Sequence, residues 1–144
     1  MTPLPTKLQE IVDDFAMASR EEKLELLIAY AETLPDLPER WQNERDQMEP
    51  VPECMTPVFL VAEADPKGRL NFYFDIPPQS PTVRGLAALL ANGLNGCHPE
   101  GILAVPAEFF YAMNLQEALS SQRLNGFPGM LLHMKHLAMQ HLES

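Results

Sequence analysis

Residues 58–75 read VFLVAEADPKGRLNFYFD, which combines two strand patterns with a strong turn signal. Residues 58–62 form a continuous apolar run typical of a central strand, and residues 70–75 alternate apolar with polar side chains, as in a half-exposed strand. Between them, residues 65–68 place Asp, Pro and Gly where a type I turn favours them. The sequence therefore predicts an antiparallel hairpin. Because two strands alone are marginal in water, we expect a third strand from residues 44–51 or close helical cover.

Helical periodicity dominates the chain on both sides of this hairpin. Ser19 and Glu22 form a capping-box pattern ahead of the second apolar stripe, and Pro128 falls inside the last one, where we expect it to kink or restart the helix. We expect helices over about residues 6–17, 20–31, 83–95, 100–104, 106–113 and 124–138. This order of elements predicts an α+β fold in which helices pack on one face of a small antiparallel sheet.

Residues 34–57 interrupt the helical pattern with five prolines and no sustained apolar period. The pattern predicts a long ordered loop, and loops of this length inside a compact domain are more often functional than idle. Trp41 argues against a linker, because a large aromatic side chain usually anchors its segment.

Size and charge exclude several classes of function. A chain of 144 residues is expected to form a single domain over residues 1–144. The formal charge of −10 should repel phosphate backbones and anionic lipid headgroups, so we expect neither nucleic acid nor a membrane as a partner. No stretch is apolar enough to span a bilayer, and no secretory signal pattern opens the chain. Two cysteines are too few for a disulfide framework, which favours a reducing, cytoplasmic location.

Cys54 is the first candidate for chemistry. Prolines on both sides stiffen its loop and present the thiol just before the central strand. A free cysteine in this setting is also a small hydrophobe, and that is the more frequent role. Glu49 and Glu53 disfavour a thiolate, and no nearby cation or helix start offsets them. On the residues alone, a reactive and a packing role both stay open.

Cys97 and His98 are a second candidate, as metal ligands completed by Cys54 and one histidine of the last helix. The possible histidines are His133, His136 and His141. Because no paired spacing typical of structural zinc sites joins them, we expect no metal.

Asp75, Arg84 and Arg123 are a third candidate group, because all three are charged residues at the ends of elements. Taken alone, they are more simply solvated side chains or surface ion pairs of little individual weight.

Six motifs in sequence order resemble one known family. They are Leu34-Pro35-Asp36-Leu37-Pro38, Val51-Pro52-Glu53-Cys54, Val58-Phe59-Leu60-Val61, Thr82-Val83-Arg84-Gly85-Leu86, Glu100-Gly101-Ile102-Leu103 and Leu119-Ser120-Ser121-Gln122-Arg123-Leu124-Asn125-Gly126. Together they resemble the SufE family of cysteine-desulfurase sulfur acceptors, also called the Fe–S metabolism-associated domain. The resemblance spans nearly the whole chain and implies a SufE/IscU-like fold.

This resemblance implies that Cys54 accepts sulfane sulfur from the persulfide of a cysteine desulfurase, stimulates that enzyme and passes the sulfur towards an Fe–S scaffold protein. It also implies that Glu53, Asp75, Arg84 and Arg123 belong to the surface that binds the desulfurase. The chain would be an accessory protein, not an enzyme, without a cofactor of its own, because pyridoxal phosphate belongs to the desulfurase.

The chain departs from the family pattern beside the cysteine. The family usually has Gly-Cys-Gln-Ser in the loop and Trp in the strand, where this chain has Glu53-Cys54-Met55-Thr56 and Phe59. Glu53 removes the backbone freedom of glycine and adds a charge. The alternative function is therefore a desulfurase-binding regulator or adaptor with weak or no sulfur transfer. A thiol enzyme would need a His and an acid that orient the cysteine, and no recognisable version of that arrangement is visible.

Overall fold

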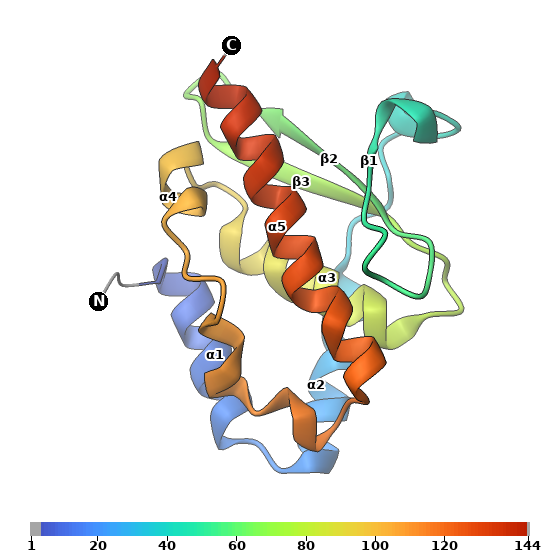
Figure 1. Ribbon diagram of the computed structural model, residues 1–144, viewed down its shortest axis with the longest axis vertical. Coiled ribbons are helices and arrows are strands. Elements are labelled where there is room, and N and C mark those ends of the chain that lie inside the picture. Colours follow the sequence, from blue (N-terminus) through green and yellow to red (C-terminus); the bar gives the residue numbers. More distant parts are fainter. Residues whose placement is uncertain (1–3, 144) are drawn as a thin grey trace.

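An antiparallel sheet with the strand order β1-β2-β3 carries the hairpin (Figure 1). The structure is a computed structural model that describes residues 4–143. Strands β2 (Phe59–Ala64) and β3 (Leu70–Asp75) pair over their full lengths, as the alternation of residues predicts. The short strand β1 (Glu49–Pro50) pairs with the other edge of β2 and supplies the expected third strand.

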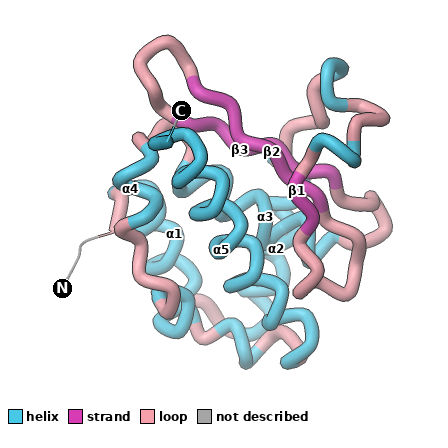
Figure 2. Tube along the Cα trace, turned by 45° about the horizontal axis from the view of Figure 1, so that its top comes forward, coloured by secondary structure: helices cyan, strands magenta, loops and turns pink. Residues whose placement is uncertain are grey.

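The helices pack on one face of this sheet, which confirms the predicted α+β fold (Figure 2). The α-helices are α1 (Thr6–Met17), α2 (Arg20–Thr33), α3 (Pro81–Leu94), α4 (Pro99–Leu103) and α5 (Ser121–Glu143), and the 3-10 turns are η1 (Glu39–Trp41), η2 (Arg45–Gln47), η3 (Phe109–Met113) and η4 (Leu115–Glu117). The capping box of α2 forms as predicted, with reciprocal bonds between Ser19 and Glu22. No helix within residues 4–143 is long and apolar enough to cross a membrane.

Helix α3 lies at the centre of the core. Its side chains from position 85 onward are almost all buried, and it contacts α1, α2, α5 and β3. Leu70, Phe72 and Phe74 on β3 turn their side chains into the same core. Because α3 is enclosed on several sides, the residues just before it are held at a fixed place beside the sheet.

The proline-rich segment before the hairpin is anchored, as Trp41 predicts. The Trp41 indole N–H donates to the Glu63 carboxylate on β2 at 2.7 Å, and Arg40 pairs with the same carboxylate. The Val51 N–H donates to the Val58 carbonyl at 2.9 Å, which closes the base of the loop that carries Cys54.

Helix α5 does not restart at Pro128, so that part of the sequence prediction is wrong. The helix is continuous, with Pro128 inside it. An interior proline costs about 3 kcal/mol, whereas burying one large apolar side chain contributes about 1.5–3 kcal/mol. Phe127, Met130 and Leu131 flank the proline and are all buried. Tertiary packing therefore offsets the local penalty and holds the helix together.

Candidate functional site

The loop that carries Cys54 rests on two glycines of α5. A methyl group added at Gly126 would stand 2.6 Å from the Cys54 sulfur, and one added at Gly129 would stand 2.7 Å from the Glu53 Cβ. The two glycines are three residues apart and therefore share one face of the helix. This bare helix face lets the loop approach closely enough to shield the thiol.

The resting Cys54 side chain is a protected thiol. It is half-buried, and its Sγ lies 3.7 Å from the Gly126 carbonyl oxygen, to which the S–H donates. Burial, and secondarily the charge of Glu53, raises the pKa of Cys54 to about 11. Because the thiolate is the nucleophile, the raised pKa leaves only a small reactive fraction near neutral pH. The loop must therefore move, or gain a partner, before Cys54 can attack.

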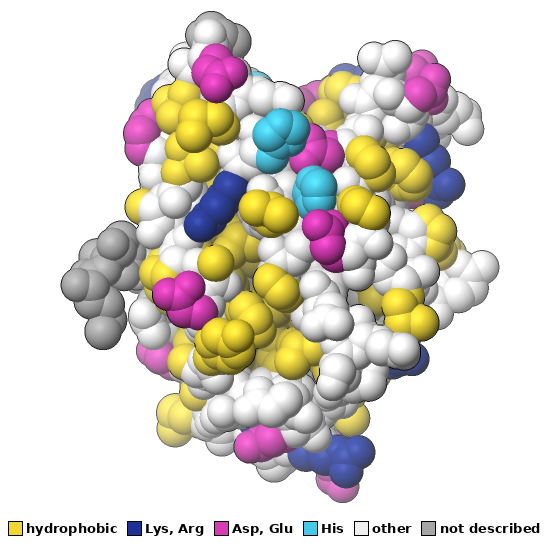
Figure 3. Space-filling model, viewed as in Figure 1, with side chains coloured by type: hydrophobic (Ala, Val, Ile, Leu, Met, Phe, Trp, Pro, Cys, Tyr) yellow, Lys and Arg dark blue, Asp and Glu magenta, His cyan; other side chains and the backbone are white. Residues whose placement is uncertain are grey.

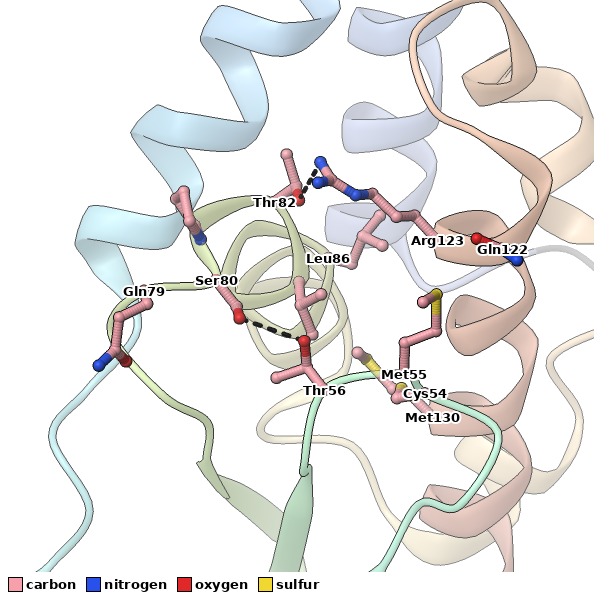
Figure 4. Close-up of a pocket in the computed structure, with 12 residues that line it drawn as sticks. Cys54, Met55, Thr56, Gln79, Ser80, Thr82, Leu86, Gln122, Arg123 and Met130 are labelled. Atoms are coloured by element: carbon pink, nitrogen blue, oxygen red, sulfur yellow. Dashed lines mark hydrogen bonds between the residues drawn. The ribbon is translucent and has the colours of Figure 1, made fainter.

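A pocket of about 290 Å³ opens beside this thiol (Figure 4). Cys54 and the exposed Met55 line it from the loop, Ser80 and Thr82 from the start of α3, and Arg123 from the start of α5. The Arg123 guanidinium donates to the Thr82 hydroxyl at 3.3 Å. The pocket thus brings a cysteine, a cation and two hydroxyl groups to one cavity, with the cation directed at Thr82 and not at the thiol.

Glu53 forms its main contact with α5. His133 Nε2 lies 3.0 Å from Glu53 Oε1, and His133 Nδ1 lies 2.5 Å from Glu49 Oε2. His136, one turn further on, places its Nδ1 2.7 Å from the other oxygen of Glu49. On the molecular face in Figure 3, histidines accordingly adjoin acidic side chains.

Asp75 and Arg84 lie near the connection between β3 and α3 and do not line the pocket. Asp75 accepts a hydrogen bond from Arg45 Nε at 2.7 Å, and Arg84 donates to the Ile76 carbonyl at 2.8 Å. Of the candidate residues, the structure brings Cys54 and Arg123 into one pocket and places Glu53 next to it.

Cys97 lies elsewhere in the fold. It forms a bridge with Leu70, at the opposite end of β3 from Asp75, whereas the Cys54 loop enters β2 beside the Asp75 end. Within residues 4–143 no group of three or more His, Cys, Asp or Glu side chains is arranged to hold a metal ion. The hypothesis that joined Cys54 and Cys97 in a metal site therefore finds no support in this geometry.

Sequence reasoning placed Arg123 of α5 at the site but missed the contacts between this helix and the Cys54 loop. It considered His133 as a possible metal ligand, yet His133 bridges two carboxylates. Eighty positions separate His133 from Glu53, so no local pattern could reveal the contact. Gly126 and Gly129 were the available signal, since small residues on one helix face permit close approach of another segment.

Comparisons with known proteins agree over nearly the whole chain. The family model SufE, described as the Fe–S metabolism associated domain, matches residues 9–138. An uncharacterized SufE-like protein of Mycobacterium tuberculosis is 41% identical over 132 residues, which cover 92% of this chain and 91% of that protein. SufE-like protein 1, chloroplastic/mitochondrial, of Arabidopsis thaliana is 34% identical over 141 residues, which cover 97% of this chain and 36% of that protein. The solution structure of a hypothetical protein from Thermus thermophilus matches with a TM-score of 0.86 at 32% identity, covering 99% of this chain and 100% of that one.

Proposed function

Because the chain belongs to the SufE family, we propose that Cys54 accepts sulfane sulfur from the persulfide of a cysteine desulfurase and passes it towards Fe–S cluster assembly. The observation that supports this proposal is the position of the Cys54 thiol in the structure. Of the two cysteines, Cys54 lines the pocket between the loop, α3 and α5, and Cys97 does not.

Sulfur transfer requires only an accessible thiolate on this chain. Cys54 first loses its proton to solvent. The thiolate then attacks the outer sulfur of the desulfurase persulfide, so that one S–S bond forms on Cys54 while the S–S bond on the desulfurase breaks. The desulfurase cysteine leaves as a thiolate, and no net oxidation or reduction occurs. No cofactor on this chain enters the reaction, because the pyridoxal phosphate that generates the persulfide belongs to the desulfurase.

The pocket gives the new persulfide a place to reside. Arg123 supplies a positive charge that favours an anionic sulfur, and the hydroxyl groups of Ser80 and Thr82 can donate to it. In the resting loop, the raised pKa of Cys54 keeps the thiol from reacting with unselected oxidants. Binding of the desulfurase would then expose the thiol where a persulfide is available.

We place the docking surface around the mouth of this pocket. Glu53 and Arg123 flank Cys54, while Asp75 and Arg84 lie at the connection that leads to the pocket residue Ser80. Stimulation of the desulfurase follows if removal of its persulfide limits turnover. The downstream partner in this proposal is an Fe–S scaffold protein, and a cytoplasmic location stays a prediction.

A regulator or adaptor is the second candidate function, and one observation favours it. Glu53, which stands beside the acceptor thiol, contributes to the raised pKa of Cys54. A protein of this kind would bind the desulfurase without taking its sulfur.

Incubation with a cysteine desulfurase and free cysteine, followed by intact mass measurement without reductant, separates the two functions. The acceptor gains the mass of one or more sulfur atoms only when cysteine is present. A chain that binds and stimulates the desulfurase but keeps its original mass would be an adaptor.

A further inference from the structure

We propose that His133 is a positioning residue, a latch that holds the Cys54 loop on α5 through Glu53 and Glu49. The consequence for sulfur transfer rests on the function proposed above. The latch itself does not depend on that function, because it concerns only how often the Cys54 loop leaves α5.

The geometry of His133 suits this task. One imidazole ring meets Glu49 in β1 at 2.5 Å and Glu53, the neighbour of Cys54, at 3.0 Å. His133 therefore ties both the start of the loop and the residue beside the thiol to one point on α5. Gly129, one turn earlier on the helix, leaves the space in which the Glu53 side chain packs. The thiol is shielded as long as these contacts hold.

Each ring nitrogen of His133 has a carboxylate oxygen within hydrogen-bond distance. A neutral imidazole has one N–H and can donate to only one carboxylate, whereas an imidazolium donates from both ring nitrogens. Hydrogen bonds between two charged partners are also the stronger kind. The charged and titratable groups that face His133 are Glu49 from β1, Glu53 from the loop and His136 from its own helix. Within residues 4–143, His133 is therefore the one side chain of α5 that contacts both Glu49 and Glu53 through hydrogen bonds.

The rate of Cys54 alkylation by iodoacetamide measures this latch without any desulfurase. The Cys97→Ser background leaves one thiol, and mass spectrometry follows its modification. We expect His133→Ala to raise the rate by about tenfold, the size expected for losing a hydrogen bond to a charged group. Comparing mutant and wild-type rates at the same pH removes the ordinary titration of the thiol.

Three further variants separate a latch from general damage to α5. His136→Ala, which removes a contact to Glu49 but none to Glu53, should stay near the wild-type rate. His133→Gln keeps one side-chain group that can donate to a carboxylate, so its rate should fall between those of the wild type and His133→Ala. Glu53→Gln should weaken the same contact from the other side. Once His133→Ala has broken that contact, Glu53→Gln can add only the effect of its charge on the thiol, so the double variant should react more slowly than the product of the two single effects predicts.

Equal rates in wild type and His133→Ala, or equal acceleration by His136→Ala, would overturn the latch. An intact latch in a chain that takes up no sulfur would refute the proposed function and leave this inference standing.

Discussion

Glu53 acts on its neighbour Cys54 in two ways. Its negative charge contributes to the raised pKa of the thiol, and its contacts with Gly129 and His133 hold the loop in the shielded position. Both effects lower the fraction of reactive thiolate. The departure of this chain from the family pattern therefore falls on the residue that most directly restrains the proposed acceptor thiol.

Replacing Glu53 with Gly should raise the rate of sulfur transfer to Cys54. The change removes the carboxylate beside a thiol that must ionise and restores the backbone freedom of glycine. The pH dependence of Cys54 alkylation should show a pKa below that of the wild type, because a negative neighbour raises a thiol pKa. Glu53→Gln is the control, since it removes the charge and keeps the side-chain volume.

Transfer by Glu53→Gly that is slower than wild type, at matched folding stability, would contradict this view of the residue. It would mean that Glu53 contacts the desulfurase in a way that favours transfer. A gain in Glu53→Gly but not in Glu53→Gln would assign the effect to loop geometry and not to charge.

Among the elements, α2 and η4 are joined by a buried ion pair. Lys23 on α2 is 1% exposed, and its Nζ donates to Glu117 Oε2 at 2.8 Å, while Glu117 itself is half-exposed. The two residues contribute unequally to stability, because only the lysine is buried. Removing its partner leaves a buried charge, whereas removing the lysine leaves a solvated carboxylate.

We expect Glu117→Ala to lower the free energy of unfolding by about 2–4 kcal/mol, the cost of leaving a buried ammonium without its partner. Lys23→Met should be nearly neutral, since an apolar side chain of similar length suits the buried site. Urea unfolding with unchanged slope gives both values. A loss in Lys23→Met as large as that in Glu117→Ala would show that the pair itself stabilises the fold.

The elements also show what a sequence reveals and what it does not. The hairpin and the capping box of α2 depend on residues that lie a few positions apart in the sequence. Alternation, turn residues and the Ser19–Glu22 spacing were therefore sufficient to predict both features. The continuity of α5 through Pro128 depends on burial against other elements. The contact of His133 with Glu53 likewise depends on the fold. The acceptor role proposed for Cys54 came from family resemblance and not from local chemistry.

At the scale of the whole molecule, a net charge of −10 makes the few cations on the surface distinctive. Arg123 stands at the pocket that holds Cys54, on a protein with 20 acidic and 10 basic residues. Binding to a desulfurase is expected to use this cation together with Asp75. Electrostatic complementarity of this kind governs which partner docks and how fast.

Arg123→Ala and Asp75→Arg should each weaken binding of the desulfurase, measured by calorimetry, while the far-UV circular dichroism spectrum stays unchanged. Arg45→Ala is the matched control for Asp75→Arg, because it breaks the same ion pair without reversing the charge at position 75. Unchanged affinity in both Arg123→Ala and Asp75→Arg would remove this surface from the proposal. Equal weakening by Arg45→Ala and Asp75→Arg would assign the effect to the lost ion pair.

The identity of the sulfur-carrying thiol tests the account most directly. The wild-type chain, Cys54→Ser and Cys97→Ser are each treated with desulfurase and cysteine, and the added sulfur is located by peptide mapping under non-reducing conditions. A serine hydroxyl is far too weakly acidic to attack a persulfide near neutral pH. We therefore predict sulfur on Cys54 in the wild type and in Cys97→Ser, and none in Cys54→Ser. Sulfur on Cys97 in the wild type, or undiminished sulfur in Cys54→Ser, would contradict the assignment of Cys54 as the acceptor.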